Sequence, residues 1–267
     1  MRFSIIVVCL NPGDKLNQTL DSILSQTCND YEVVVKDGGS RDGSVEAMRS
    51  DARICFYQEK DGGIYEAMNQ AVAHAEGDFV LFLNCGDFFP DEKVLEQTSA
   101  YIDREAAQGT DLSRLVLYGD TLGEKNGVVI ASPSRIDGFV CYRNIPCHQA
   151  CFYSRRLCAD KPYDPAYRIR ADYDHFLWCY YRAGAKFVHM DLAAASYEGG
   201  GFSESKANRK RDRQEHRQIT ESYMRKGELF KYKAVMACTL APLRSAMAES
   251  SAFSGIYHEW KRLIYRR

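Results

Sequence analysis

Apolar and polar residues follow two patterns that alternate through the first part of the chain. Short apolar runs rich in β-branched residues occur at residues 3–9, 31–35, 53–57 and 79–83. Apolar residues at helical spacing follow at residues 16–24 and 64–72, and a further helix is expected to begin within residues 45–48. Continuous apolar runs are typical of strands buried on both faces. The alternation therefore predicts βαβ units, that is, an α/β fold with a mainly parallel, Rossmann-like sheet flanked by helices.

The second half of the chain has a less regular pattern. Apolar runs at residues 115–118, 128–130, 150–153 and 186–189 predict further strands. Residues 173–182 have the apolar spacing of a helix, and the highly charged residues 204–226 also indicate a helix.

The composition is that of a globular protein, because 45% of the 267 residues are hydrophobic and 27% are charged. This balance excludes a chain that is disordered throughout. No apolar run approaches the roughly 18 residues that a membrane-spanning helix needs. The first apolar run ends at Asn11-Pro12-Gly13 without the small-residue cleavage site of a signal peptide.

Ten cysteines are spread along the chain, and none forms a CxxC pair. Zinc sites and disulfide frameworks usually have tighter or more regular spacing. We therefore interpret the cysteines as free thiols in a reducing compartment, and we expect a cytoplasmic protein.

The net charge of −1 hides an asymmetry between the two ends of the chain. Residues 1–205 carry 20 basic and 30 acidic side chains, whereas residues 206–267 carry 15 basic and 6 acidic ones. Such a basic segment can contact an anionic membrane surface or a nucleic acid, or it can be a solvated helix.

Polar residues stand where three of the expected strands end, at Asn11, Asp37 and Asp87. Ligands of open parallel sheets bind at the carboxyl ends of strands. Asp37 precedes a glycine-rich loop, so its carboxylate can either accept hydrogen bonds from a nucleoside or cap the turn. Asp87 can either bind a hard cation that neutralises a diphosphate or cap the helix that follows.

Two further polar positions in the second half are candidates for chemistry. Asp172 and Asp174 open the helix predicted at residues 173–182, and each can act as a general base or as a helix cap. His148 precedes an apolar strand and can bind metal or phosphate, orient a sugar, or be structural. No Walker loop and no GxGxxG after the first strand are present, which argues against a P-loop enzyme and a dinucleotide oxidoreductase.

Several motifs in order carry a resemblance to a known family. They lie at residues 34–43, 59–69, 77–87, 148–149, 171–174 and 199–203. Together they resemble the family 2 inverting glycosyltransferases with the A-type nucleotide-sugar fold, and within them the bacterial exopolysaccharide transferases of the colanic acid cluster type. The resemblance covers residues 3–203, so we expect a catalytic domain there, with a nucleotide-sugar half at 1–110 and an acceptor half at 111–203. Residues 204–267 would form a basic, mostly helical extension.

The resemblance implies a role for each matching residue. Asp172 stands where the family has its catalytic base, and Asp87 would bind Mn²⁺ or Mg²⁺. The nucleotide sugar would contact a set of loop residues, namely Leu10, Asn11, Asp37, Asp61, Gly62, Gly63, Asn69, Asn84, His148 and Gln149.

The chain departs from the family pattern at four positions within these motifs. Asn84 and Gly86 occupy places where Asp is common, Ala171 stands where Glu is common, and Lys36 replaces a neutral residue. One clear carboxylate remains in the metal motif. Mg²⁺ can be held by one protein carboxylate together with substrate phosphates, so the metal expectation stands.

These observations lead to one expected function and two alternatives. The expected function is an inverting transfer of sugar from a UDP- or GDP-linked donor to an acceptor hydroxyl, as on a lipid-linked glycan in bacterial surface polysaccharide synthesis. The basic extension would then contact the inner face of the cell membrane peripherally, and no nucleic acid is expected as a partner. The alternatives are a nucleotidyltransferase and a catalytically lapsed scaffold that binds nucleotide sugars.

Overall fold

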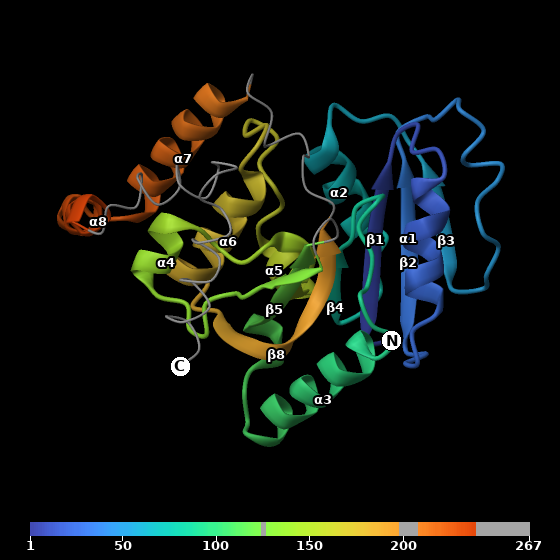
Figure 1. Ribbon diagram of the computed structural model, residues 1–267, viewed down its shortest axis with the longest axis horizontal. Helices are drawn as coiled ribbons and strands as arrows, with labels where there is room; N and C mark the ends of the chain where they lie inside the picture. Colours follow the sequence, from blue (N-terminus) through green and yellow to red (C-terminus); the bar gives the residue numbers. More distant parts are fainter. Residues whose placement is uncertain (124–126, 198–207, 239–267) are drawn as a thin grey trace. The chain divides into compact units, whose positions relative to one another are not determined.

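The computed structural model describes residues 1–123, 127–197 and 208–238 (Figure 1). The strands are β1 (Phe3–Cys9), β2 (Tyr31–Asp37), β3 (Ile54–Gln58), β4 (Phe79–Phe82), β5 (Leu115–Gly123), β6 (Val128–Ile130), β7 (Cys151–Ser154) and β8 (Lys186–Tyr197). The α-helices are α1 (Lys15–Leu24), α2 (Ile64–Ala73), α3 (Val94–Ala107), α4 (Gly138–Arg143), α5 (Arg155–Asp160), α6 (Ala171–Tyr181), α7 (Arg209–Tyr223) and α8 (Lys226–Cys238).

The eight strands of the described residues belong to one sheet, with the order β3-β2-β1-β4-β7-β5-β6 and with β8 paired to β5. Strands β1 to β4 pair in parallel, as the sequence predicts. The second half is mixed, because β7 is antiparallel to both β4 and β5, β6 is antiparallel to β5, and β8 is parallel to β5. The carboxyl ends of β1, β2 and β4 therefore lie along one edge of the sheet.

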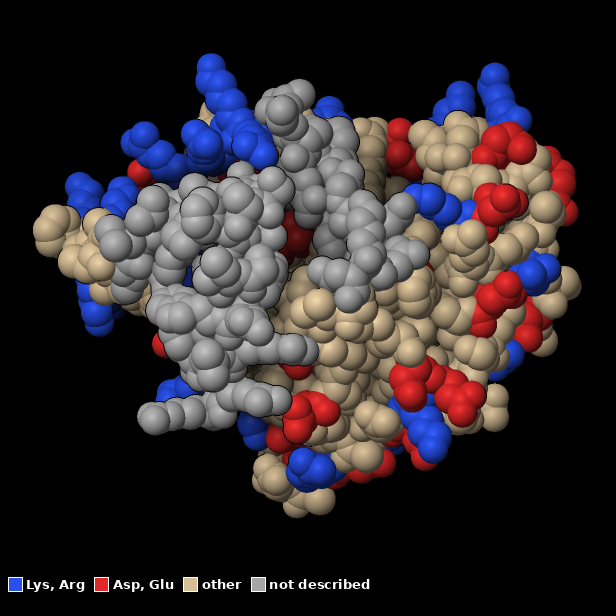
Figure 2. Space-filling view, viewed as in Figure 1, with Lys and Arg blue, Asp and Glu red and all other residues tan. Residues whose placement is uncertain are grey.

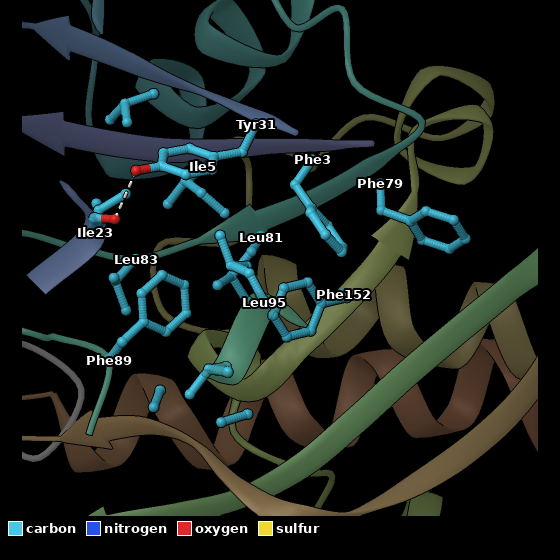
Figure 3. Packing of buried hydrophobic residues seen from close by; sticks show 14 of the residues in the cluster. Phe3, Ile5, Ile23, Tyr31, Phe79, Leu81, Leu83, Phe89, Leu95 and Phe152 are labelled. Atoms are coloured by element: carbon cyan, nitrogen blue, oxygen red, sulfur yellow. Dashed lines mark hydrogen bonds between the residues drawn. The ribbon is translucent and has the colours of Figure 1, made fainter. Parts of the chain in front are cut away.

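The sheet is covered on both faces, which explains the continuous apolar runs. All seven residues of β1 and of β2 are buried. Alternate side chains of a strand point to opposite faces. Phe3, Ile5 and Val7 form one buried cluster with apolar residues of α1 and α3, whereas α2 contacts β1 and β2 outside that cluster (Figure 3).

Two contacts hold the strands and the first helix in register. The Tyr31 hydroxyl donates to the Ile23 carbonyl at 2.8 Å, which fastens β2 to the end of α1 (Figure 3). The rings of Phe3 and Phe152 meet edge to face, with centroids 5.7 Å apart, and join β1 to β7. Such aromatic pairs stabilise a core by about 0.5–1.5 kcal/mol beyond their burial.

The structure corrects the helix expected from residues 45–48. The chain makes only turns there, because Gly43 adopts a φ of 82° and the strand β3 begins a few residues later. One isolated turn is too short to nucleate a helix. The Asn17 side chain bonds the Ala47 carbonyl and the Arg49 amide instead.

Other elements differ from the expectations in extent. The last strand is longer than expected, and α4 and α5 were not predicted, since six-residue helices carry too little periodicity. Within the charged segment, residues 209–223 form α7, and α8 begins at Lys226, where the segment ends. The motif at residues 199–203 lies outside the described residues.

The chain divides into two compact units, Met1–Ile219 and Thr220–Arg267. The first unit contains the whole sheet and most of α7, so it extends beyond the expected boundary at residue 203. Among the helices of the described ranges, none combines the length and apolar character that crossing a bilayer requires.

Replacing Gly77 tests the packing of β1 against the start of β4. A Cβ at Gly77 would lie 2.5 Å from the Phe3 carbonyl carbon and 2.6 Å from the Ser4 nitrogen, which are backbone atoms that cannot move aside. We expect Gly77→Ala to lower the free energy of unfolding by about 1–3 kcal/mol, as overpacking does. Urea denaturation measures this change. Gly227→Ala, where a Cβ meets nothing within 4 Å, should change it little; equal effects would contradict the packing.

Candidate active site

The loops that follow β1 and β2 are joined by backbone and side-chain hydrogen bonds. The Asn11 amide donates to the Ser40 hydroxyl at 2.7 Å, and the Arg41 amide donates to Asn11 Oδ1 at 2.8 Å. Asn11 takes a left-handed φ of 49°, which asparagine tolerates better than most residues. The Gly13 amide donates to Asp42 Oδ2 at 2.8 Å. Asn11 is thus part of a rigid pair of loops at the sheet edge.

Asp37 is fully buried beneath these loops. Its carboxylate accepts the Gly39 amide at 2.9 Å, the Ser40 amide at 2.8 Å, Gln58 Nε2 at 2.8 Å and the Ser40 hydroxyl. Burial raises the pKa of Asp37, but the bonds from Ser40 and Gln58 outweigh it and hold the pKa below its ordinary value. The geometry matches the turn-capping alternative, in which an ionised Asp37 organises the loop.

Leu10 and Asp61 meet above Gly38. A Cβ at Gly38 would lie 2.9 Å from Asp61 Oδ2 and 3.4 Å from Leu10 Cδ1. Leu10 is 61% exposed, and the Asp61 carboxylate is paired with the ammonium of Lys36, which is 1% exposed. The structure therefore brings Leu10, Asp61 and the buried Lys36 together at the ends of β1 and β2.

The glycine pair after Asp61 connects this corner to the loop that precedes α6. The Gly63 amide donates to Asp61 Oδ1 at 3.0 Å, and Gly63 has a φ of 145° that favours glycine. The Gly62 amide donates to Glu66 Oε2 at 2.8 Å. Arg168 Nη1 donates to the Gly62 carbonyl at 2.8 Å.

A hydrogen-bonded chain joins three of the predicted residues from distant parts of the sequence. Asn84 Nδ2 lies 3.2 Å from His148 Nε2, and His148 Nδ1 lies 3.3 Å from Asp172 Oδ2. The Tyr65 hydroxyl lies 2.9 Å from Asp172 Oδ1 and 2.6 Å from the Ile169 carbonyl. An amide NH₂ can only donate, so His148 Nε2 faces a donor and Nδ1 faces the Asp172 carboxylate.

The electrostatics of Asp172 follow from these contacts. Burial raises the pKa of Asp172, but the hydrogen bonds from His148 and Tyr65 bring the pKa below its ordinary value. The Tyr65 hydroxyl shows the opposite shift, because burial and the neighbouring Asp172 charge raise its pKa. At neutral pH the site therefore holds an ionised Asp172 beside a protonated Tyr65 hydroxyl.

Asp87 is also buried, and its backbone amide donates to the Asn84 carbonyl at 2.9 Å. Its Oδ2 accepts from Gln149 Nε2 at 2.9 Å, and its carbonyl accepts from the Thr19 hydroxyl at 2.8 Å.

Within residues 1–123, 127–197 and 208–238, no group of three or more His, Cys, Asp or Glu side chains is placed to hold a metal. Asn84 Oδ1 is buried and finds no hydrogen-bond partner among the described residues. A carboxylate and an unpartnered amide oxygen are donors of the kind that Mg²⁺ and Mn²⁺ accept, so the residues fit such an ion bound jointly with phosphates.

Asn69 is not part of the hydrogen-bonded chain. Both ends of its side-chain amide bond the Tyr163 backbone, with Nδ2 donating to the carbonyl at 2.8 Å and Oδ1 accepting the amide at 2.9 Å. Tyr163 in turn packs edge to face on Tyr65, with ring centroids 5.4 Å apart. Asn69 therefore holds the Tyr163 backbone, and Tyr163 in turn supports the Tyr65 ring.

Two residues of this site were not singled out from the sequence. Tyr65 lies inside the motif at residues 59–69, and its position just after the glycine pair could have indicated that it belongs to the site. The role of Arg168 could not be predicted from the sequence, because the residue that it contacts, Gly62, lies 106 residues earlier in the chain.

Comparison with known proteins identifies the family. The family model of Glycosyl transferase family 2 matches residues 4–157, more than half of the chain. The chain belongs to glycosyltransferase family 2. The sequence-based resemblance is thereby confirmed.

Curated members of family 2 cover much of this chain. A PGL/p-HBAD biosynthesis glycosyltransferase of Mycobacterium bovis is 35% identical over 75% of this chain and 78% of its own length. An uncharacterized glycosyltransferase of Mycobacterium tuberculosis is 32% identical over 65% of this chain and 67% of its own length.

Solved structures confirm the A-type fold. S. aureus TarS has a TM-score of 0.67 at 21% identity, covering 94% of this chain and 44% of TarS. The TarS fragment 1–349, with a TM-score of 0.62 at 24% identity, is covered over 60% of its length and 74% of this chain. The mannosyltransferase PcManGT from Pyrobaculum calidifontis, in complex with GDP-Man and Mn²⁺, has a TM-score of 0.64 at 16% identity, covering 98% of this chain and 85% of its own.

The lowered pKa of Asp172 predicts a pH-dependent contribution to stability. A carboxyl whose pKa is lower in the folded state stabilises that state above its unfolded pKa, about 4, and this contribution is lost as pH falls through the folded pKa. We expect the difference in unfolding free energy between wild type and Asp172→Asn to shift against the wild type as the pH falls below about 4. Chemical denaturation at each pH measures it. A difference that is the same at every pH would contradict the assignment.

Proposed function

We propose that this family 2 protein is an inverting glycosyltransferase that moves a sugar from a nucleotide-diphosphate sugar to an acceptor hydroxyl. The observation that carries the proposal is the ionised Asp172 carboxylate, held by His148 and Tyr65 beside the loops at the carboxyl ends of β1, β2 and β4. A general base needs such a carboxylate within reach of the proton that it takes.

The donor would occupy the corner formed by the β1, β2 and Asp61 loops. The exposed Leu10 side chain offers an apolar surface to a base, and Asp61 offers a carboxylate to a ribose. Asp37 would act indirectly, because its carboxylate is already bonded to the loop that it organises. Structures of similar fold bind UDP-GlcNAc in TarS and GDP-Man in PcManGT, which supports a UDP- or GDP-linked donor.

The reaction would be a single displacement. As an acceptor hydroxyl oxygen attacks the anomeric carbon, its proton passes to Asp172, the bond from that carbon to the diphosphate oxygen breaks, and the nucleoside diphosphate leaves. Tyr65 and His148 each contact one oxygen of the carboxylate. A carboxylate has about four acceptor positions, so an acceptor hydroxyl can still bond to it. His148 and Gln149 would orient the groups around Asn84 and Asp87.

Mn²⁺ or Mg²⁺ would be held by Asp87, with the Asn84 amide oxygen as a second donor. Such an ion supplies positive charge that stabilises a departing diphosphate. Asn84 takes the place of a carboxylate here, so the protein itself would contribute one negative charge to the ion.

The acceptor would be a glycan or a lipid-linked glycan in surface polysaccharide synthesis. The basic C-terminal segment supports this, and Lys and Arg side chains lie over α7 (Figure 2). Each basic residue close to an anionic membrane contributes about 1 kcal/mol to binding. We propose that the protein works in the cytoplasm, peripherally at the inner membrane face.

A panel of nucleotide sugars tests the proposal. UDP-, GDP-, dTDP- and CMP-linked sugars are each added with Mn²⁺, Mg²⁺ or a chelator, and the melting temperature is measured. A donor at a hundredfold excess over its Kd stabilises the native state by about 2.7 kcal/mol. Stabilisation by one class of nucleotide-diphosphate sugar, followed by its turnover, supports the transferase. Stabilisation by nucleoside triphosphates alone would favour a nucleotidyltransferase, and binding without turnover, even with acceptor supplied, would favour a scaffold.

Asp172→Asn tests the general base. The change keeps the shape of the side chain but removes the proton acceptor, so turnover should fall roughly 10²–10⁴-fold while donor binding persists. Release of nucleoside diphosphate measures turnover, and the thermal shift measures binding. Asp174→Asn is a matched control from the same helical turn, because Asp174 bonds Lys161 at 2.8 Å outside the chain of Asp172. Unchanged turnover in Asp172→Asn would remove the residue from the role.

Asp87→Ala tests the cation site. Removing the carboxylate that would bind the ion should abolish the metal-dependent part of donor stabilisation and leave the metal-independent part. The same thermal-shift series with and without chelator measures both parts. Full metal-dependent affinity in the variant would show that Asp87 does not bind the ion.

A further inference from the structure

Glu215 of α7 caps the backbone segment that leads into α6. Its Oε1 accepts the Arg168 amide at 3.0 Å, and its Oε2 accepts the Ile169 and Arg170 amides, each at 3.0 Å. Glu215 is 4% exposed. One buried carboxylate thus binds three consecutive backbone N–H groups.

These amides have no local cap. Helix α6 begins after Arg170, whose own side chain makes no capping hydrogen bond. The three amides belong to the N-cap residue Arg170 and the two residues before it, at the end of the helix that negative charge stabilises. The cap comes instead from a helix 45 residues further along the chain. Hydrogen bonds to a carboxylate are about twice as strong as neutral ones, so this segment is firmly held.

Two further contacts join α7 to the residues on either side of Asp172. Asp212 binds the Arg170 guanidinium through both oxygens, at 2.7 and 3.0 Å. The His216 ring stacks on Tyr173, with centroids 5.2 Å apart.

The same short segment also contacts the donor loop and the hydroxyl beside Asp172. The Ile169 carbonyl accepts the Tyr65 hydroxyl while its amide bonds Glu215, and the Arg168 side chain bonds the Gly62 carbonyl. A shift of this segment would therefore move Tyr65 and Asp172 relative to the donor loop.

We propose that Glu215 is a positioning residue, whose carboxylate fixes the backbone of residues 168–170 and thereby aims Asp172 at the acceptor hydroxyl. The inference rests on the proposed transferase function. It makes the first part of α7 a component of the catalytic apparatus, in line with a compact unit that continues to Ile219.

Glu215→Gln tests the proposal, with Glu105→Gln as its matched control. Glu105 is an equally buried carboxylate, 6% exposed, but it bonds Thr110 and Lys186 at the far end of α3. In Glu215→Gln we expect faster hydrogen exchange at the amides of residues 168–170. We also expect kcat to fall about 10²-fold, the loss typical of a misplaced catalytic group, with the donor KM unchanged. In Glu105→Gln, at a temperature where it is folded, kcat and exchange at 168–170 should equal those of the wild type.

Equal kcat in the two variants, or unchanged exchange at residues 168–170 in Glu215→Gln, would overturn the inference. If Glu215→Gln does not fold, Asp212→Asn replaces it, because Asp212 and Arg170 are partly exposed and their pair contributes little to stability. That variant should lower kcat by a smaller factor at unchanged donor KM, and an unchanged kcat overturns the proposal. A wild type that binds donor but turns none over would instead refute the proposed function, and hydrogen exchange still decides whether Glu215 holds the segment.

Discussion

A carboxylate removed from water must be given hydrogen-bond donors, and this constraint organises the site. Asp37 and Glu215 are buried and Asp172 is partly buried, and each accepts at least one hydrogen bond from a segment distant in sequence. Because each needs several donors at once, each fixes the relative position of the loops that supply them. The sheet provides the edge on which these loops stand, but the buried carboxylates determine how the loops face one another.

The first half of the fold could be predicted because its strands and helices follow from the spacing of apolar residues within short stretches of sequence. Continuous apolar runs in β1 and β2 reflect burial on both faces, and the stripe in α1 reflects one covered face. Residues 45–48 had a helical pattern but lay too close to Gly43 and β3 to form a helix. The antiparallel pairing of β7 could not be predicted, since strand direction depends on where the connecting segments pack.

Only those residues of the candidate site that belong to sequence motifs could be predicted. Asn84, His148 and Asp172 each belong to a recognised motif, and the structure brings them into one hydrogen-bonded chain. Glu215 had no motif, because a glutamate in a highly charged helix looks like any solvated residue until its three backbone partners are known. Asn69 had a motif, but its amide serves the Tyr163 backbone.

The Tyr65 hydroxyl has two acceptors within reach and only one proton to give. While Asp172 is ionised, its charge attracts that proton. If Asp172 takes a proton from an acceptor, as proposed, rotation about the Tyr65 C–O bond can direct the hydroxyl to the Ile169 carbonyl instead. This hydroxyl would then serve either charge state of Asp172 by a rotation alone, so little reorganisation would separate one catalytic cycle from the next.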